Sequence, residues 1–336
     1  MKIGVLGAGT WGIALATLLA GNDHDVTVWS ALPEEIDLLE KNSVHANLPG
    51  VILPNNIKYT KSIEEVAKGK ELILFVVPSK FIRSTAEKIA PFVEDGTILV
   101  TAAKGIEGGT LKTMSEIVLE EVMLPYSGRK MNVAALSGPT HAEEVALGIP
   151  TSIVAACENV AVSERIAEAF ANSCMRVYTN TDIKGVEICG AMKNIIALAA
   201  GINNGMGLGD NTKAMLMTRG IAEITRLGLA MGCKRQTFMG LAGIGDLIVT
   251  CTSRHSRNNR CGELIGKGKT YEEASKEIGM VVEGYYALEA AIELSKKYAV
   301  ELPITEAVYQ VLKEGLSPKD AMYRLMTRDL KSELED

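Results

Sequence analysis

Residues 2–12 read Lys2-Ile3-Gly4-Val5-Leu6-Gly7-Ala8-Gly9-Thr10-Trp11-Gly12, and they carry the strongest structural signal in the first half of the chain. A short strand-like run leads into three glycines spaced G-x-G-x-x-G, and an apolar helical pattern follows over 13–20. In this setting the first glycine makes a tight turn, the second lets a pyrophosphate approach the backbone, and the third lets the helix pack on the strand. The amides at the helix N-terminus favour phosphate. The stretch therefore predicts a dinucleotide-binding βαβ unit.

Apolar runs alternate with helical stretches through the rest of the first half. The runs occupy 25–30, 71–78, 97–102 and 132–136, with further strands expected at 151–156 and 176–179 and helices near 80–90 and 110–123. Continuous apolar runs are typical of parallel strands that are buried on both faces. The pattern predicts an α/β fold with an N-terminal Rossmann domain, a doubly wound and mostly parallel sheet.

Strand signals almost vanish after Thr181-Asp182, a plausible helix N-cap pair. We therefore predict two domains, 1–181 for dinucleotide binding and 182–336 as an all-α, substrate-binding and catalytic domain. The glycine-rich segment 201–210 is expected to be a shaped loop that ends the first helix of the second domain.

The end of the second strand leaves the choice between NAD and NADP open. An acid there binds the adenosine ribose hydroxyls, and an arginine nearby accepts the 2′-phosphate. The sequence offers Ser30 and Ala31 at this point, so neither signal is present. Glu34 and Glu35 follow Pro33 and are interpreted as ordinary acids of a first helical turn.

Composition excludes several classes of function. The 336 residues are 47% hydrophobic and 23% charged with a formal net charge of -6, which argues against nucleic acid or an anionic membrane as a partner. No signal peptide is predicted, and the apolar runs are interrupted short of a membrane span. Six cysteines without a CxxC pair and four histidines without ligand spacing indicate no metal site and a cytoplasmic location.

Lys193 interrupts a nearly all-apolar helical stretch over 185–200. A lysine is almost never fully buried unless a partner pairs with it, so Lys193 belongs either to a structural ion pair or to a catalytic site. Gly190, Ala197 and Ala200 share its helix face and would leave room beside the amine. Asp246, between two glycines and an apolar run, is the candidate partner; burial would lower the pKa of the amine and the carboxylate would raise it.

Two further groups of residues suit an anionic ligand. Lys104, Gly138 and Thr140 follow predicted strands, whose carboxyl ends are where such sheets bind ligands, although Lys104 could also be a solvated turn lysine. Arg254, Arg257 and Arg260 recur with Ser256 and Asn258 among them. Guanidinium groups bind phosphate bidentately, and the alternative is a solvated basic helix face.

Seven motifs in register closely resemble the bacterial-type NAD(P)-dependent sn-glycerol-3-phosphate dehydrogenase family. They are Gly7–Gly12, Ala103-Lys104-Gly105, Ser137-Gly138-Pro139-Thr140, Gly190-Ala191-Met192-Lys193-Asn194, Gly243-Ile244-Gly245-Asp246-Leu247, Thr250-Cys251-Thr252-Ser253 with Ser256-Arg257-Asn258, and Val281-Val282-Glu283-Gly284. The resemblance implies a homodimer that interconverts sn-glycerol 3-phosphate and dihydroxyacetone phosphate by hydride transfer with NAD or NADP. It also implies a role in supplying glycerol phosphate for phospholipid synthesis.

The resemblance also implies roles for individual residues. Lys193 matches the proton acceptor, and we assign Asp246 and Lys104 to the catalytic group with it. Substrate contacts are implied for Lys104, Gly138, Thr140, Lys193, Asp246, Ser256, Arg257 and Asn258. Cofactor contacts are expected at Gly7, Gly9, Thr10, Trp11, Gly12, Lys104, Ala142, Arg257, Val281 and Glu283. The chain departs from many members at Ser30-Ala31, where they carry a basic residue, and at His141, where they carry phenylalanine.

Two alternative functions share these features. A β-hydroxyacid dehydrogenase has a Rossmann and helical layout and a similar Gly-x-x-Lys-Asn, but it needs a site for a carboxylate rather than a phosphate. A Rossmann protein that only senses NAD(P)H would need no buried pair of lysine and aspartate.

Overall fold

The structure is a computed structural model that describes residues 1–123 and 130–333. The chain forms two compact units. The first comprises 1–104 and 113–183, and the second comprises 105–112 and 184–336. The short segment 105–112, which directly follows Lys104, thus belongs to the second unit, and Ile106 lies in the core of that unit. No feature of the sequence predicted that residues 105–112 belong to the second unit.

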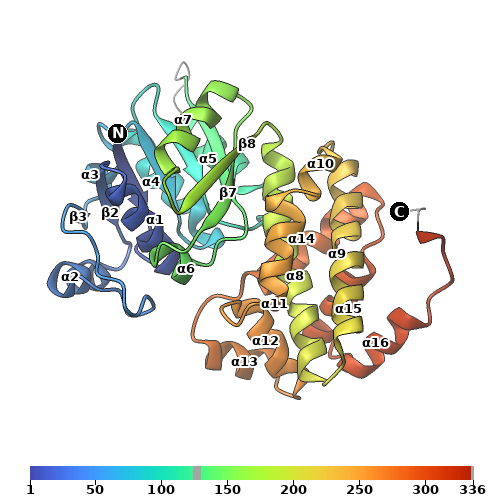
Figure 1. Ribbon diagram of the computed structural model, residues 1–336. Helices are drawn as coiled ribbons and strands as arrows, with labels where there is room; N and C mark the ends of the chain where they lie inside the picture. The colour runs from blue at the N-terminus through green and yellow to red at the C-terminus, as the bar shows by residue number, and fades with distance from the viewer. Residues whose placement is uncertain (124–129, 334–336) are drawn as a thin grey trace. The chain divides into compact units, whose positions relative to one another are not determined.

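The first unit contains an eight-stranded sheet in the order β3-β2-β1-β4-β5-β6-β7-β8. Figure 1 labels β2, β3, β7 and β8 of this sheet. Every neighbouring pair is parallel except β6 and β7, which confirms the predicted mostly parallel sheet. The short edge strand β3 was not predicted, because three residues are too few to show a periodicity. The strands are β1 Lys2–Leu6, β2 Asp25–Trp29, β3 Lys58–Thr60, β4 Leu72–Phe75, β5 Ile98–Thr101, β6 Asn132–Ser137, β7 Thr151–Ala156 and β8 Met175–Asn180.

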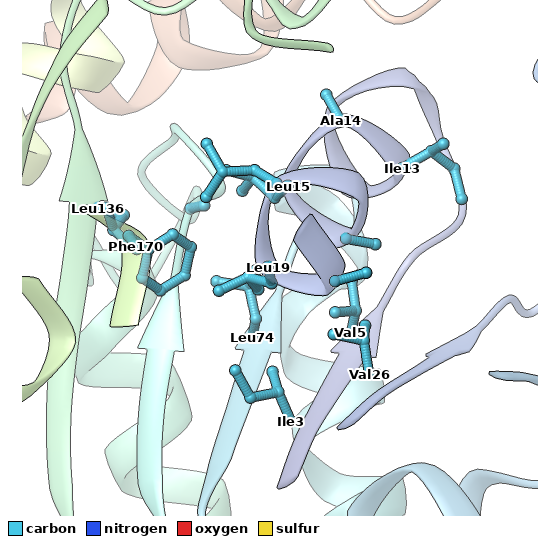
Figure 2. Close-up of a cluster of buried hydrophobic side chains, with 14 of the residues drawn as sticks. Ile3, Val5, Ile13, Ala14, Leu15, Leu19, Val26, Leu74, Leu136 and Phe170 are labelled. Atoms are coloured by element: carbon cyan, nitrogen blue, oxygen red, sulfur yellow. The ribbon is translucent and has the colours of Figure 1, made fainter. Parts of the chain in front are cut away.

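Alternate residues of the central strands belong to two apolar clusters, one on each face of the sheet. On one face Leu15 and Leu19 of α1 lie over Leu74, beside Leu136 and Phe170 (Figure 2). The opposite face carries Leu6, Ile73, Phe75 and Leu99. Burial on both faces explains why these strands read as continuous apolar runs. The helices of this unit are α1 Thr10–Gly21, α2 Pro33–Asn42, α3 Ile63–Ala67, α4 Ile82–Ile89, α5 Met114–Met123, α6 Ala142–Ala146 and α7 Val160–Phe170, with 3₁₀ turns at Ser79–Phe81 and Ala90–Phe92.

Apart from the segment 105–112, the described part of the second unit is mainly helical, as predicted. Its helices (yellow to red in Figure 1) are α8 Ile183–Gly205, α9 Asp210–Ala230, α10 Arg235–Phe238, α11 Asp246–Thr252, α12 Arg257–Gly266, α13 Tyr271–Ile278, α14 Glu283–Tyr298, α15 Pro303–Lys313 and α16 Pro318–Met326, with a π-helical turn at Leu241–Gly245. A continuous apolar core joins α8 to α9, α12, α14 and α15.

The long helix α8 is buried from Gly185 to Asn203. By length and apolar composition it could cross a membrane, contrary to the expectation that every apolar run is too short, but its apolar window is entirely buried inside the protein. The core around it supplies the apolar environment that a bilayer would otherwise provide. Ala197 and Ala200, expected to leave room for a substrate, are fully buried in this core.

The prediction of a loop at 201–210 is wrong for its first half, because α8 continues to Gly205. A Cβ on Gly201 would lie 2.0 Å from the carbonyl oxygen of Asn259, and one on Gly205 would lie 2.2 Å from that of Glu263. Gly262 and Gly266 of α12 meet the backbone of α8 equally closely. These glycines therefore let the backbones of two helices touch, a packing role that local sequence does not distinguish from a flexible loop.

A buried carboxylate, Glu223 of α9, caps the N-terminus of α15. Its side chain accepts hydrogen bonds from the backbone amides of Ile304 at 2.5 Å and Thr305 at 3.3 Å, and from the Thr305 hydroxyl at 3.3 Å. Burial raises the pKa of Glu223 to about 7, while the two amides and Arg226 oppose the rise. The folded protein therefore binds a proton at Glu223 between about pH 4.5 and 7 that the unfolded chain releases.

Stability should consequently fall as pH rises through this range. Glu223→Gln keeps an acceptor oxygen for the amides and removes the titration. The free energy of unfolding of the variant minus that of the wild type should therefore be about 2 kcal/mol larger at pH 8 than at pH 5.5. Urea denaturation followed by circular dichroism measures the change. Glu306→Gln, at an exposed position of α15, is the control and should show no such change. An equal difference at both pH values would contradict the assignment.

Candidate active site

The glycine-rich turn has the geometry that binds a dinucleotide. Gly7 has a φ of +124°, which strains any residue with a side chain. A Cβ on Gly12 would lie 2.0 Å from the carbonyl oxygen of Gly7, whereas one on Gly9 would enter open space. The three glycines therefore make the turn, allow close packing of α1 and leave the backbone open to a ligand, as the spacing predicts.

The N-terminus of α1 fits a pyrophosphate group. No side chain caps this helix at Gly9, and its first turn contains no acidic residue. The Thr10 hydroxyl is buried and has no hydrogen-bond partner within the described part of the chain. Helix amides and an unsatisfied hydroxyl together match the needs of phosphate oxygens. Trp11, also predicted to contact the cofactor, packs against the core beside this turn.

Three of the predicted residues come together at the carboxyl ends of β5 and β6. The Lys104 amine donates to the carbonyl oxygen of Gly138 at 3.4 Å, and the Thr140 hydroxyl donates to the same oxygen at 3.1 Å. His141 and Ala142 follow at the start of α6. This is the edge of the sheet where doubly wound folds bind ligands.

The structure places an acidic side chain at the end of β2, where the sequence indicated none. Ser30 and Ala31 do stand there, but the Ser30 hydroxyl donates to the Glu35 carboxylate at 2.5 Å. Glu34 and Glu35 are both acids of the first turn of α2, as expected, but Glu34 is exposed whereas Glu35 is half-buried and bonded to Ser30. The fold therefore brings an acid to a position at which the linear sequence has none.

The central feature of the second unit is the pairing of Lys193 with Asp246. The Lys193 amine donates to Asp246 Oδ1 at 2.7 Å and to the Thr250 hydroxyl at 2.5 Å. Lys193 is 5% exposed and Asp246 1%. The Thr250 hydroxyl in turn lies 2.6 Å from the carbonyl oxygen of Asp246. The pairing predicted for Lys193 is present, and Thr250, which was not among the predicted site residues, completes the group.

Local sequence explains how Asp246 reaches this place. The π-helical turn Leu241–Gly245 directly precedes α11, and Asp246 is the first residue of that helix. A Cβ on Gly243 would lie 2.0 Å from the carbonyl oxygen of Phe238, so only glycine permits the close turn. Asp246 and Thr250 are four residues apart on α11 and therefore share one face of it. Burial also raises the pKa of the neighbouring Cys251 thiol to about 12, which keeps that thiol protonated.

The start of α12 gathers the predicted phosphate-binding residues. Ser256 is the N-cap and accepts a hydrogen bond from the Asn259 amide at 3.2 Å, and half-buried Arg257 is the first helical residue. Arg254 precedes the helix, and both Arg254 and Arg260 are exposed. Arg257 is thus the arginine of the three that lies at the helix N-terminus, where an anion is favoured.

Asn258 is buried and ties three helices together. Its amide group donates to Asn194 Oδ1 at 3.0 Å, and its oxygen accepts from the Gly284 amide at 2.9 Å. Glu283, the first residue of α14, and Val281, two residues before it, are the remaining predicted cofactor contacts. The network holds the start of α14 against Asn194, the residue that follows Lys193.

A dinucleotide-binding sheet in the first unit and a buried pair of lysine and aspartate in the second are typical of one class of protein, the nicotinamide-dependent oxidoreductases. Among residues 1–123 and 130–333, no group of three histidine, cysteine, aspartate or glutamate side chains could hold a metal ion.

Comparisons with known proteins narrow this class. Residues 2–163 match the family model described as NAD-dependent glycerol-3-phosphate dehydrogenase N-terminus, and residues 182–323 match the corresponding C-terminus. A glycerol-3-phosphate dehydrogenase [NAD(P)+] of Lactobacillus delbrueckii subsp. bulgaricus is 55% identical over 99% of both chains. One from Agathobacter rectalis is 50% identical over 99% of this chain and 97% of its own.

Solved structures agree with these relatives. The crystal structure of glycerol-3-phosphate dehydrogenase from Coxiella burnetii superposes with a TM-score of 0.92 at 36% identity, covering 97% of this chain and 99% of the other. The chain belongs to the NAD-dependent glycerol-3-phosphate dehydrogenase family.

Proposed function

We propose that the protein interconverts sn-glycerol 3-phosphate and dihydroxyacetone phosphate with NAD or NADP as the hydride carrier. The buried group of Lys193, Asp246 and Thr250 is the single observation that carries the proposal. A protein that only sensed the cofactor would gain nothing from a buried ion pair, which is costly to desolvate. The full-length similarity to named glycerol-3-phosphate dehydrogenases supports the choice of substrate.

The first unit holds the cofactor in this proposal. When bound, the nicotinamide ring accepts or supplies the hydride. Gly7, Gly9, Thr10 and Gly12 receive the pyrophosphate through backbone amides and a hydroxyl, and Trp11 and Ala142 line the cofactor. Lys104 contributes a positive charge at the strand ends, next to Gly138 and Thr140 as substrate contacts.

Lys193 is the proposed acid–base residue. During oxidation the C2 hydroxyl loses its proton to the Lys193 amine while the C2 hydride leaves for the cofactor, and reduction reverses both transfers. Asp246 and Thr250 orient the amine through their hydrogen bonds. A lysine fixed by two partners loses little freedom when it meets the substrate, which favours the transition state.

Ser256, Arg257 and Asn258 hold the substrate phosphate. Arg257 offers bidentate donors at the N-terminus of α12, where the helix amides add partial positive charge. Arg257, Val281 and Glu283 also contact the cofactor in this assignment. Binding energy from the distant phosphate aligns the reacting C2 carbon.

The proposal extends to the cellular role. Glycerol 3-phosphate made in this way supplies phospholipid synthesis, and the expected setting is a homodimer in the cytoplasm. The functional division is 1–181 for the cofactor and 182–336 for substrate binding and catalysis. Size-exclusion chromatography with light scattering tests the dimer directly.

Turnover with and without the substrate phosphate tests the function. The protein should oxidise NADH or NADPH when dihydroxyacetone phosphate is added, as followed by absorbance. In the reverse direction Arg257→Ala should lower kcat/KM for sn-glycerol 3-phosphate about 10- to 100-fold, because one charge-assisted contact is lost. Activity toward glycerol, which has no phosphate, should change much less.

Arg260→Ala is the matched control, since Arg260 lies exposed on the same helix. It should leave both activities unchanged. Equal losses for glycerol and glycerol phosphate in Arg257→Ala would contradict a phosphate role. Oxidation of a 3-hydroxy acid in place of sn-glycerol 3-phosphate would overturn the proposed substrate.

A further inference from the structure

The junction of β2 and α2 presents a carboxylate beside the glycine-rich turn. Ser30 is 6% exposed, and its hydroxyl donates to Glu35 Oε2 at 2.5 Å while it accepts from the Leu32 amide at 3.1 Å. The hydroxyl therefore fixes both the turn out of β2 and the direction of the Glu35 side chain. Glu35 stands at the carboxyl end of β2, although it is five residues beyond Ser30 in the sequence.

Two contacts connect this junction with the cofactor turn. The Gly7 amide donates to the carbonyl oxygen of Trp29 at 2.8 Å, so the end of β2 and the glycine turn are direct neighbours. His45, in the segment after α2, interacts both with Glu35 and with the backbone of Ala8 in the glycine-rich turn. Burial lowers the pKa of His45, and the charge of Glu35 and a hydrogen bond with the Ala8 backbone oppose this effect. His45 Nδ1 accepts from the Asn47 amide at 3.2 Å.

The charges at this junction favour one form of the cofactor. In dinucleotide-binding folds an acid at the end of the second strand accepts hydrogen bonds from the adenosine ribose hydroxyls, whereas an arginine nearby accepts a 2′-phosphate. Residues 30–35 read Ser-Ala-Leu-Pro-Glu-Glu and contain no lysine or arginine. A 2′-phosphate would therefore meet a carboxylate and no basic side chain of this segment, and like charges in such proximity repel.

We propose that Glu35, oriented by Ser30, selects NAD over NADP by accepting hydrogen bonds from the adenosine ribose hydroxyls and repelling a 2′-phosphate. Ser30 acts as a positioning residue. The inference rests on the proposed function, and it adds the cofactor preference that the sequence leaves open. The repulsive element matters as much as the attractive one, because specificity is a difference between two affinities.

Direct binding of NADH and NADPH, without substrate, tests the inference. Fluorescence titration of the wild type should give a Kd for NADH at least about tenfold below that for NADPH. Glu35→Gln should lower the ratio of the NADPH Kd to the NADH Kd at least about tenfold. The change should come mainly from tighter binding of NADPH, because the amide keeps an acceptor oxygen and loses the charge. Ser30→Ala should weaken NADH binding by releasing the carboxylate.

Glu34→Gln removes a charge from the neighbouring exposed position and should leave the ratio unchanged. Equal wild-type affinities, tighter binding of NADPH, or an unaltered ratio in Glu35→Gln would overturn the inference. Each of these results is compatible with turnover of dihydroxyacetone phosphate, so it would leave the proposed function standing. Selective NADH binding without any turnover would instead contradict the proposed function alone.

Discussion

Lys193→Met is expected to lower kcat about 10²- to 10⁴-fold, which is the range that a positioned acid–base residue contributes. The methionine side chain has similar length and fills the same buried space, but it can neither accept nor donate the proton of the C2 hydroxyl. Steady-state assays with dihydroxyacetone phosphate measure the loss. Circular dichroism must show native helix content, because the substitution also leaves Asp246 buried without the amine that pairs with it.

Lys193→Arg separates proton transfer from charge pairing. Arginine keeps the positive charge beside Asp246 but does not deprotonate in proteins. If Lys193 moves the proton, this variant should be folded and nearly as inactive as Lys193→Met. A folded Lys193→Arg enzyme with kcat close to the wild type would show that Lys193 has only a structural role.

Gly201→Ala should destabilise the helical unit by about 3 kcal/mol, at the upper end of the range for overpacked sites. The new Cβ would lie 2.0 Å from the Asn259 carbonyl oxygen and 2.9 Å from the Glu263 amide nitrogen. Both obstacles belong to the backbone of α12, so no side chain can rotate away. The intrinsic preference of helices for alanine, about 1 kcal/mol, is too small to offset the clash.

Gly21→Ala is the matched control because Gly21 also lies in a helix and its Cβ would enter open space. Urea denaturation should show this control to be as stable as the wild type or slightly more stable. Equal stability of Gly201→Ala and Gly21→Ala would mean that the α8 and α12 backbones are not in tight contact.

Local patterns were sufficient to predict most of the fold. The glycine turn, the alternation of strands and helices and the helical second half all follow from constraints that act within a few residues. Gly7 needs a positive φ because of its own turn, and the strands are continuously apolar because both faces of the sheet are covered. The same patterns failed at β3, which is too short, and at 201–205, where glycines that look like a loop serve helix packing.

The dinucleotide-binding turn, the α/β and all-α halves and a buried lysine in need of a partner could all be predicted from the sequence. Asp246 was one candidate partner in the sequence, but its pairing with Lys193 and the addition of Thr250 depend on the packing of segments 53 and 57 residues away along the chain. Only the tertiary structure decided that Glu35, rather than a residue of β2 itself, brings a carboxylate to the end of that strand. Backbone preferences are local and leave periodic traces in a sequence, whereas the partner of a buried charge is chosen by the packing of distant segments, which no short pattern records.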